Sequence, residues 1–129
     1  MSVWPLSTAE GQLVSVSIRV HPNGLESLLE ALAQVSFPIN PQIYHDAAVV
    51  YRYADDREET EAATLVEFPA YEAHLGEVRA ALEAYGFEAG SMLVVAMLDE
   101  IQSGSHAEPA PPGADYVARY RVKHRAAVA

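Results

Sequence analysis

The sequence predicts an α+β domain in which a four-stranded antiparallel sheet carries two helices on one face. Three observations predict this fold: an alternating apolar segment near the start, two segments with apolar residues at helical spacing, and two strand-like segments between them. With a last apolar run, the elements follow in the order strand, helix, strand, strand, helix, strand. This is the order of the ferredoxin-like βαββαβ plait.

The first strand and the first helix are predicted from a change of period. Residues Leu13–Val20 alternate between an apolar face and a mixed face, and a period of two marks a half-buried strand. Asn23, followed three residues later by Glu26, is a variant of the capping box that opens a helix. An amphipathic helix over Gly24–Val35 is therefore predicted. Its apolar stripe consists of Leu25, Leu28, Leu29, Leu32 and Val35.

A strand pair is predicted to follow. Pro38 and Pro41 end the first helix because proline lacks an amide hydrogen and restricts the residue before it. Gln42–Tyr53 and Ala62–Phe68 are rich in β-branched and aromatic residues, which is typical of strands. The acidic residues 54–61 between them are predicted to form a solvated hairpin tip.

The last two elements are predicted in the same way. Pro69 suits the first position of a second helix, and Gly86 suits its end. Ser91–Leu98 is a short apolar run that predicts a final buried strand.

The rest of the chain is predicted to lie outside this domain. Residues 1–102 form the domain, and residues 103–113 are a linker rich in proline, glycine and serine. Residues 114–129 contain four of the chain's eight basic residues and one acidic residue. This tail therefore has a net charge of +3, and residues 1–113 have a net charge of −13. We expect the tail to dock on the acidic domain, or on a partner, through charge complementarity.

The composition of the chain excludes several classes of function. The chain has 129 residues, a formal charge of −10, one lysine (Lys123) and no cysteine. The lack of cysteine excludes a disulfide scaffold, a cysteine zinc site and a thiol nucleophile. The negative charge disfavours nucleic acid and anionic lipid, because phosphate recognition depends on clustered lysine and arginine. No secretory signal is recognisable, and no apolar run reaches the roughly 20 residues of a membrane span, so a cytoplasmic protein is expected.

Motifs for metal binding and catalysis are missing from the sequence. It has no glycine-flanked serine elbow and no phosphate-binding loop, and its histidines stand singly rather than at the short spacing typical of zinc ligands. The sequence predicts no metal site, no cofactor and no catalytic residue. The five histidines are His21, His45, His74, His106 and His124.

One pair of turns suggests a ligand site. The turn after the first strand and the start of the second strand are predicted to converge beside the amino end of the first helix, where exposed amides and the helix dipole favour an anion. A plain helix cap and a plain turn are the alternative interpretation. The candidate ligand-binding residues are His21, Asn23, Gly24, Asn40 and Gln42.

The same residues carry a resemblance to a known family. The turn Pro22-Asn-Gly-Leu25 after a strand, the leucine-rich helix and the segment Phe37–Ile43 resemble the ACT domain, a small regulatory module that senses small molecules. The resemblance implies paired domains and a small ligand, such as an amino acid, held by Gly24 and by the segment around Asn40 and Gln42. Phe37-Pro38 replaces the family's usual glycine, and His21 stands where an acidic residue is common.

Three hypotheses for function follow. The first is a stand-alone ACT-like protein, non-catalytic and homodimeric, that binds a small molecule such as an amino acid or another anion. The second is a small dimeric enzyme with a cleft between helices and sheet, in which His45, Tyr51 or Glu67 serves as acid or base. The third is a structural module that engages a partner protein through its open sheet face or its tail.

Overall fold

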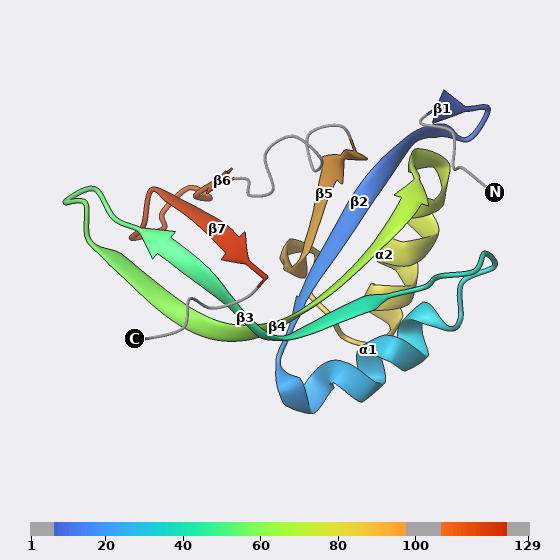
Figure 1. The fold of residues 1–129 in the computed structure, drawn as a ribbon, viewed down its shortest axis with the longest axis horizontal. Helices are drawn as coiled ribbons and strands as arrows, with labels where there is room; N and C mark the ends of the chain where they lie inside the picture. Colours follow the sequence, from blue (N-terminus) through green and yellow to red (C-terminus); the bar gives the residue numbers. More distant parts are fainter. Residues whose placement is uncertain (1–6, 98–106, 124–129) are drawn as a thin grey trace.

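The computed structural model of the protein describes residues 7–97 and 107–123. In these residues, two α-helices pack on a curled antiparallel sheet of six strands in the order β5-β2-β4-β3-β7-β6 (Figure 1). A short strand, β1, pairs with the start of β2. The strands are β1 (Ser7–Thr8), β2 (Gly11–Val20), β3 (Gln42–Arg52), β4 (Glu58–Tyr71), β5 (Met92–Ala96), β6 (Ala107–Pro109) and β7 (Ala118–Val122). The helices are α1 (Leu25–Leu32) and α2 (Leu75–Ala84).

The prediction of a four-stranded ferredoxin-like plait is wrong, because the sheet continues past β3. Strand β2 ends opposite Thr64, so the hairpin of β3 and β4 extends beyond it. β7 pairs with Ala48–Arg52 of β3, and β6 pairs with β7. These two strands come from the segments that the sequence analysis assigned to a linker and a tail. An exposed strand edge is a template for further pairing, and here the same chain supplies the next strand.

The core lies between the two helices and one face of the sheet. The predicted apolar face of β2 is buried, with Val14, Val16, Ile18 and Val20 all in the core, but Leu13 and Ser17 on the other face are buried as well, so the strand is not half-buried as predicted. Side chains of both helices pack against these four core residues. Complete burial of a valine or isoleucine side chain stabilises a fold by about 1.5–3 kcal/mol, so this cluster holds the layers together. The helix residues in the cluster are Leu28, Leu32, Val78 and Leu82.

The second helix begins later than predicted. Pro69 lies in β4, opposite Ser15 of β2, and pairing continues to Tyr71. A short 3-10 turn over Glu72–His74 then leads into α2. The proline signal for a helix start was overridden by strand pairing. The predicted last strand is present as β5, and its predicted end at Leu98 lies outside the described residues.

The sheet face opposite the helices lies inside the curl, and we call it the inner face. The strand register places Arg19 and Leu65 on it, together with Val49 and Arg121. Leu65 and Val49 are fully buried there. The chain's own strand β7 thus covers part of the face that the sequence analysis left open for a partner. No helix in the described residues is long and apolar enough to cross a membrane.

Candidate functional site

The inner face gathers four of the chain's eight lysine and arginine residues. Arg119 and Arg121 alternate along β7, and Lys123 follows two positions later. Arg19 of β2 lies across the curl from them. Basic side chains are therefore concentrated on one face of a chain whose net charge is −10.

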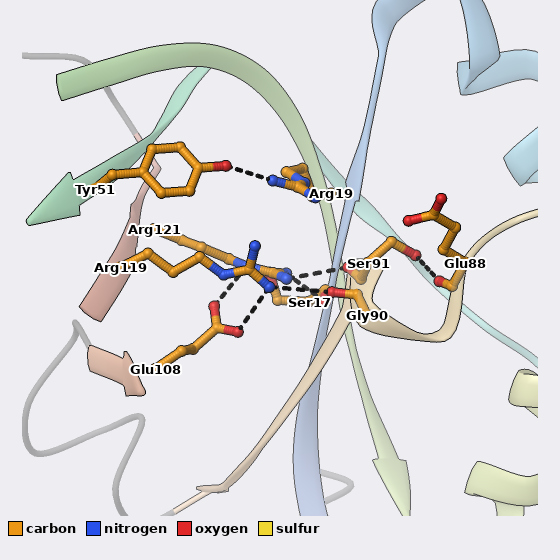
Figure 2. Close-up of polar contacts among 9 residues, drawn as sticks. All are labelled: Ser17, Arg19, Tyr51, Glu88, Gly90, Ser91, Glu108, Arg119 and Arg121. Atoms are coloured by element: carbon orange, nitrogen blue, oxygen red, sulfur yellow. Dashed lines mark hydrogen bonds and ion pairs between the residues drawn. The ribbon is translucent and has the colours of Figure 1, made fainter. Parts of the chain in front are cut away.

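Arg121 is the most deeply placed of these residues, with 8% of its surface exposed. Its Nη1 donates to the Ser17 backbone oxygen at 2.6 Å and to Ser17 Oγ at 3.1 Å, and its Nη2 donates to the Ser91 backbone oxygen at 3.1 Å (Figure 2). Its Nε lies 3.3 Å from Glu108 Oε1. Burial lowers the pKa of Arg121, while Glu108 opposes that shift. Arg121 thus ties β7 to β2, to β6 and to the turn before β5.

Glu108 lies between two guanidinium groups. Its Oε2 is 3.5 Å from Arg119 Nη2, and its Oε1 makes the ion pair with Arg121 but no hydrogen bond. Arg119 Nη2 also donates to the Gly90 backbone oxygen at 3.5 Å. Burial opposes the charge of Arg119, but Glu108 and two nearby tyrosines outweigh it and raise its pKa. We interpret this network as a structural clamp, because its donors are directed at the protein itself.

A pocket of about 490 Å³ opens around Lys123, which directly follows β7. Lys123 Nζ lies 3.1 Å from Glu67 Oε1 and 5.5 Å from the centre of the Tyr44 ring. The Tyr44 hydroxyl donates to Gln42 Oε1 at 2.7 Å. We call this cavity the Lys123 pocket. Its lining residues are Ser15, Pro38, Ile39, Asn40, Gln42, Tyr44, Glu67, Phe68, Pro69, Met97 and Lys123.

The structure separates the five predicted ligand-binding residues. Asn40 and Gln42 line the Lys123 pocket. His21 and Gly24 line a different hollow of about 420 Å³, which they share with Arg19. The backbone N–H of Asn23 donates to His21 Nδ1, which closes the turn locally.

The two turns do not share one cavity because β2 and β3 run parallel to each other, each antiparallel to β4. Val20, at the end of β2, lies opposite Thr64. Gln42, at the start of β3, lies opposite Glu67, three residues further along β4. The crossover through α1 therefore separates the turn after β2 from the start of β3.

The residues of the enzyme hypothesis are also dispersed. His45 is exposed, Glu67 lines the Lys123 pocket, and Tyr51 lines another hollow. Within residues 7–97 and 107–123, no group of three or more histidine, aspartate or glutamate residues is arranged to hold a metal ion.

The sequence analysis missed Lys123 and its two arginine neighbours as inner-face residues. Their positions, 119, 121 and 123, repeat every second residue, which is the period of a strand. That signal was present, but a basic segment behind several prolines was interpreted as a tail.

Comparison with known proteins gives no relative: no family model, no curated protein and no solved structure matches this chain. The resemblance to the ACT domain stays a prediction.

Proposed function

We propose that this protein binds a small organic monocarboxylate in the Lys123 pocket, as a non-catalytic binding or regulatory protein. The observation that carries the proposal is the ion pair of Lys123 with Glu67 inside a cavity that also has apolar walls. Its volume of about 490 Å³ falls in the range typical of small-molecule sites, roughly 300–1,000 Å³.

The polar groups suit a carboxylate. An ammonium group carries three N–H donors, and a charge-assisted hydrogen bond to an anion is stronger than a neutral one. Glu67, whose side chain is 12% exposed, holds the Lys123 ammonium at the pocket and can accept from a ligand N–H or O–H. Asn40, Gln42 and Ser15 add neutral polar groups.

The charges and the apolar residues of the pocket further restrict which ligands fit it. Among the lining residues that the structure describes, one lysine stands beside one glutamate, and this carboxylate repels a doubly charged phosphate more than a single carboxylate. Ile39, Phe68 and Met97 provide surface for an apolar ligand body. An apolar amino acid or a simple aliphatic or aromatic acid fits both features.

Calorimetric titration tests the proposal. The protein is titrated with hexanoate, phenylacetate and leucine, each alongside its uncharged amide. We expect a carboxylate to bind and Lys123→Met to weaken it by about 10- to 150-fold, which corresponds to the loss of a hydrogen bond to a charged group worth about 1.5–3 kcal/mol. Arg79→Met, on the exposed side of α2, is the control and should leave binding unchanged. Equal affinities for acids and amides, or an Lys123→Met variant that binds as the wild type does, would contradict the proposal.

A further inference from the structure

A further hollow lies at the end of the inner face nearest the turn between β3 and β4, and three of the chain's seven tyrosines line it. It has a volume of about 410 Å³ and shares no lining residue with the Lys123 pocket. We call it the tyrosine hollow. Its lining residues are Tyr51, Tyr53, Glu59, Thr60, Glu61, Asp115 and Tyr116.

The rings of the tyrosine hollow are held in place. Tyr51 and Tyr116 meet edge to face, with ring centres 4.9 Å apart and planes at 70°. Arg19 Nη1 donates to the Tyr51 hydroxyl at 3.0 Å, so the far end of that ring is anchored at the clamp (Figure 2). Tyr53 is fixed separately, since its hydroxyl donates to Glu59 Oε2 at 3.0 Å. Preorganised rings lose little freedom when a ligand binds, which favours affinity.

Negative charge lies at the rim of the hollow. Glu59, Glu61 and Asp115 are exposed, whereas the three tyrosines are half-buried. Two arginines lie at its inner end and are already paired: Arg19 donates to the Tyr51 hydroxyl, and Arg119, which pairs with Glu108, also interacts with Tyr51 and Tyr116. A ligand that enters from solvent therefore meets carboxylates first and aromatic rings next.

The chain itself provides a precedent for cation binding here. The Arg57 guanidinium lies 4.3 Å from the centre of the Tyr53 ring, and its Nη1 is 3.7 Å from Glu59 Oε1. Tyr53 and Glu59, which both line the hollow, thus already hold one organic cation together. Cation–π attraction is strongest when the cation lies within about 6 Å of the ring centre, as Arg57 does.

We propose that the tyrosine hollow binds an organic ammonium group of the methylated or quaternary type. Such a group has a diffuse charge and an apolar surface, which matches aromatic walls with an acidic rim. A metal ion does not fit as well, because hard cations require several oxygen ligands at short range. The group can arrive as a free small molecule or on a methylated lysine side chain of a peptide, since the chemistry recognised is the same.

The test compares two ligands of the same shape and different charge. Choline and its uncharged isostere 3,3-dimethylbutan-1-ol are titrated into the full-length protein by calorimetry. We expect choline to bind and the alcohol to bind at least about tenfold more weakly, because only the cation interacts with the ring faces. Equal binding of both, or no binding of choline and of a trimethyllysine peptide, would overturn the proposal. Binding of the peptide but not of choline assigns the group to a protein partner.

Substitutions at Tyr116, with matched controls, test whether the binding takes place at this hollow. Tyr116→Ala should weaken choline binding by about 2- to 30-fold, whereas Tyr116→Phe, which keeps the ring, should retain it. Tyr85→Ala, at an exposed tyrosine at the end of α2, is the matched control. If Tyr116→Ala lowers the melting temperature, the surface variant Asp115→Asn replaces it, with a loss of affinity expected. Unchanged affinity in the Tyr116→Ala variant, or in Asp115→Asn where it is used, places the binding elsewhere and overturns the inference.

Lys123→Met should leave choline binding intact, so failure of the carboxylate proposal is distinguishable from failure of this one.

Discussion

At the scale of single residues, Arg121 shows how a buried charge can serve structure rather than chemistry. Its three hydrogen bonds reach the backbone or side chain of Ser17 and the backbone of Ser91, and its ion pair reaches Glu108. A buried cation is costly unless it is paired and hydrogen-bonded, and here both conditions are met. Removal of such a residue is destabilising, because its polar partners stay buried and lose their hydrogen bonds and their ion pair.

We therefore predict that Arg121→Met lowers the free energy of unfolding by about 3–5 kcal/mol, since Glu108 would keep a buried charge without its closest partner. Urea denaturation followed by circular dichroism measures the change. Arg52→Met is the matched control: Arg52 lies 3.7 Å from Glu58, and both side chains are about half exposed. Exposed pairs contribute about 0–1 kcal/mol, so the control should be nearly neutral. Similar losses in the two variants would show that Arg121 is not a clamp.

At the scale of elements, the sequence predicted those features that a single segment determines. The alternation in β2 and the leucine stripe of α1 were visible because each depends on one segment. Pro69 was misplaced because its local signal competes with pairing to Ser15, which is distant in sequence. β7 was missed for the same reason: its partner, β3, lies about 70 residues earlier, and its alternate positions hold charges instead of apolar residues.

The residues of the candidate site also differ in whether the sequence could predict them. Asn40 and Gln42 were predicted as ligand-binding residues and do line a pocket, because they lie at the start of β3, which the sequence predicted: Gln42 begins the strand and Asn40 stands two residues before it. Lys123, which carries the proposed function, reaches that pocket only through the pairing of β7 with β3. A single sequence does not encode that pairing in any local pattern.

The connection between α1 and β3 provides a prediction at the element scale. The backbone N–H of Ser36 and its hydroxyl both donate to the Glu77 carboxylate of α2, the hydroxyl at 2.7 Å. These hydrogen bonds lower the pKa of Glu77. A lowered pKa in the folded protein means that the pair stabilises the fold above the ordinary pKa of glutamate. That stability is lost as the pH falls through the lowered value.

Ser36→Ala should accordingly raise the pKa of Glu77 towards its ordinary value and flatten the loss of stability on acidification. Carboxyl NMR titration measures the pKa, and urea denaturation across the acidic range measures the stability. Ser27→Ala, at an exposed position on α1, is the control for removal of a hydroxyl. A pKa of Glu77 that is the same in Ser36→Ala and wild type would show that the Ser36 hydroxyl does not lower it.

At the scale of the whole molecule, the curl of the sheet explains how an acidic chain keeps a basic interior face. Arg121 and Lys123 lie on the inner face with Glu108 and Glu67 as counterions. Both proposed sites depend on this arrangement, because Lys123 and Tyr116 come from the segment that closes it.

Removal of residues 114–129 tests that dependence for the molecule as a whole. Without β7, the edge of β3 over Ala48–Arg52 is unpaired, and Val49 and Leu65 lose the cover that Arg121 and its neighbours provide. We expect a loss of unfolding free energy larger than that of Arg121→Met, because strand pairing and apolar cover are lost with the clamp.

An unpaired edge also favours association between chains, so sedimentation should show larger assemblies than the full-length protein forms. Urea denaturation and analytical ultracentrifugation measure the two effects. A truncated chain with the stability and the assembly state of the full-length protein would mean that β7 is an appendage, and that β5, β2, β4 and β3 form a complete sheet without it.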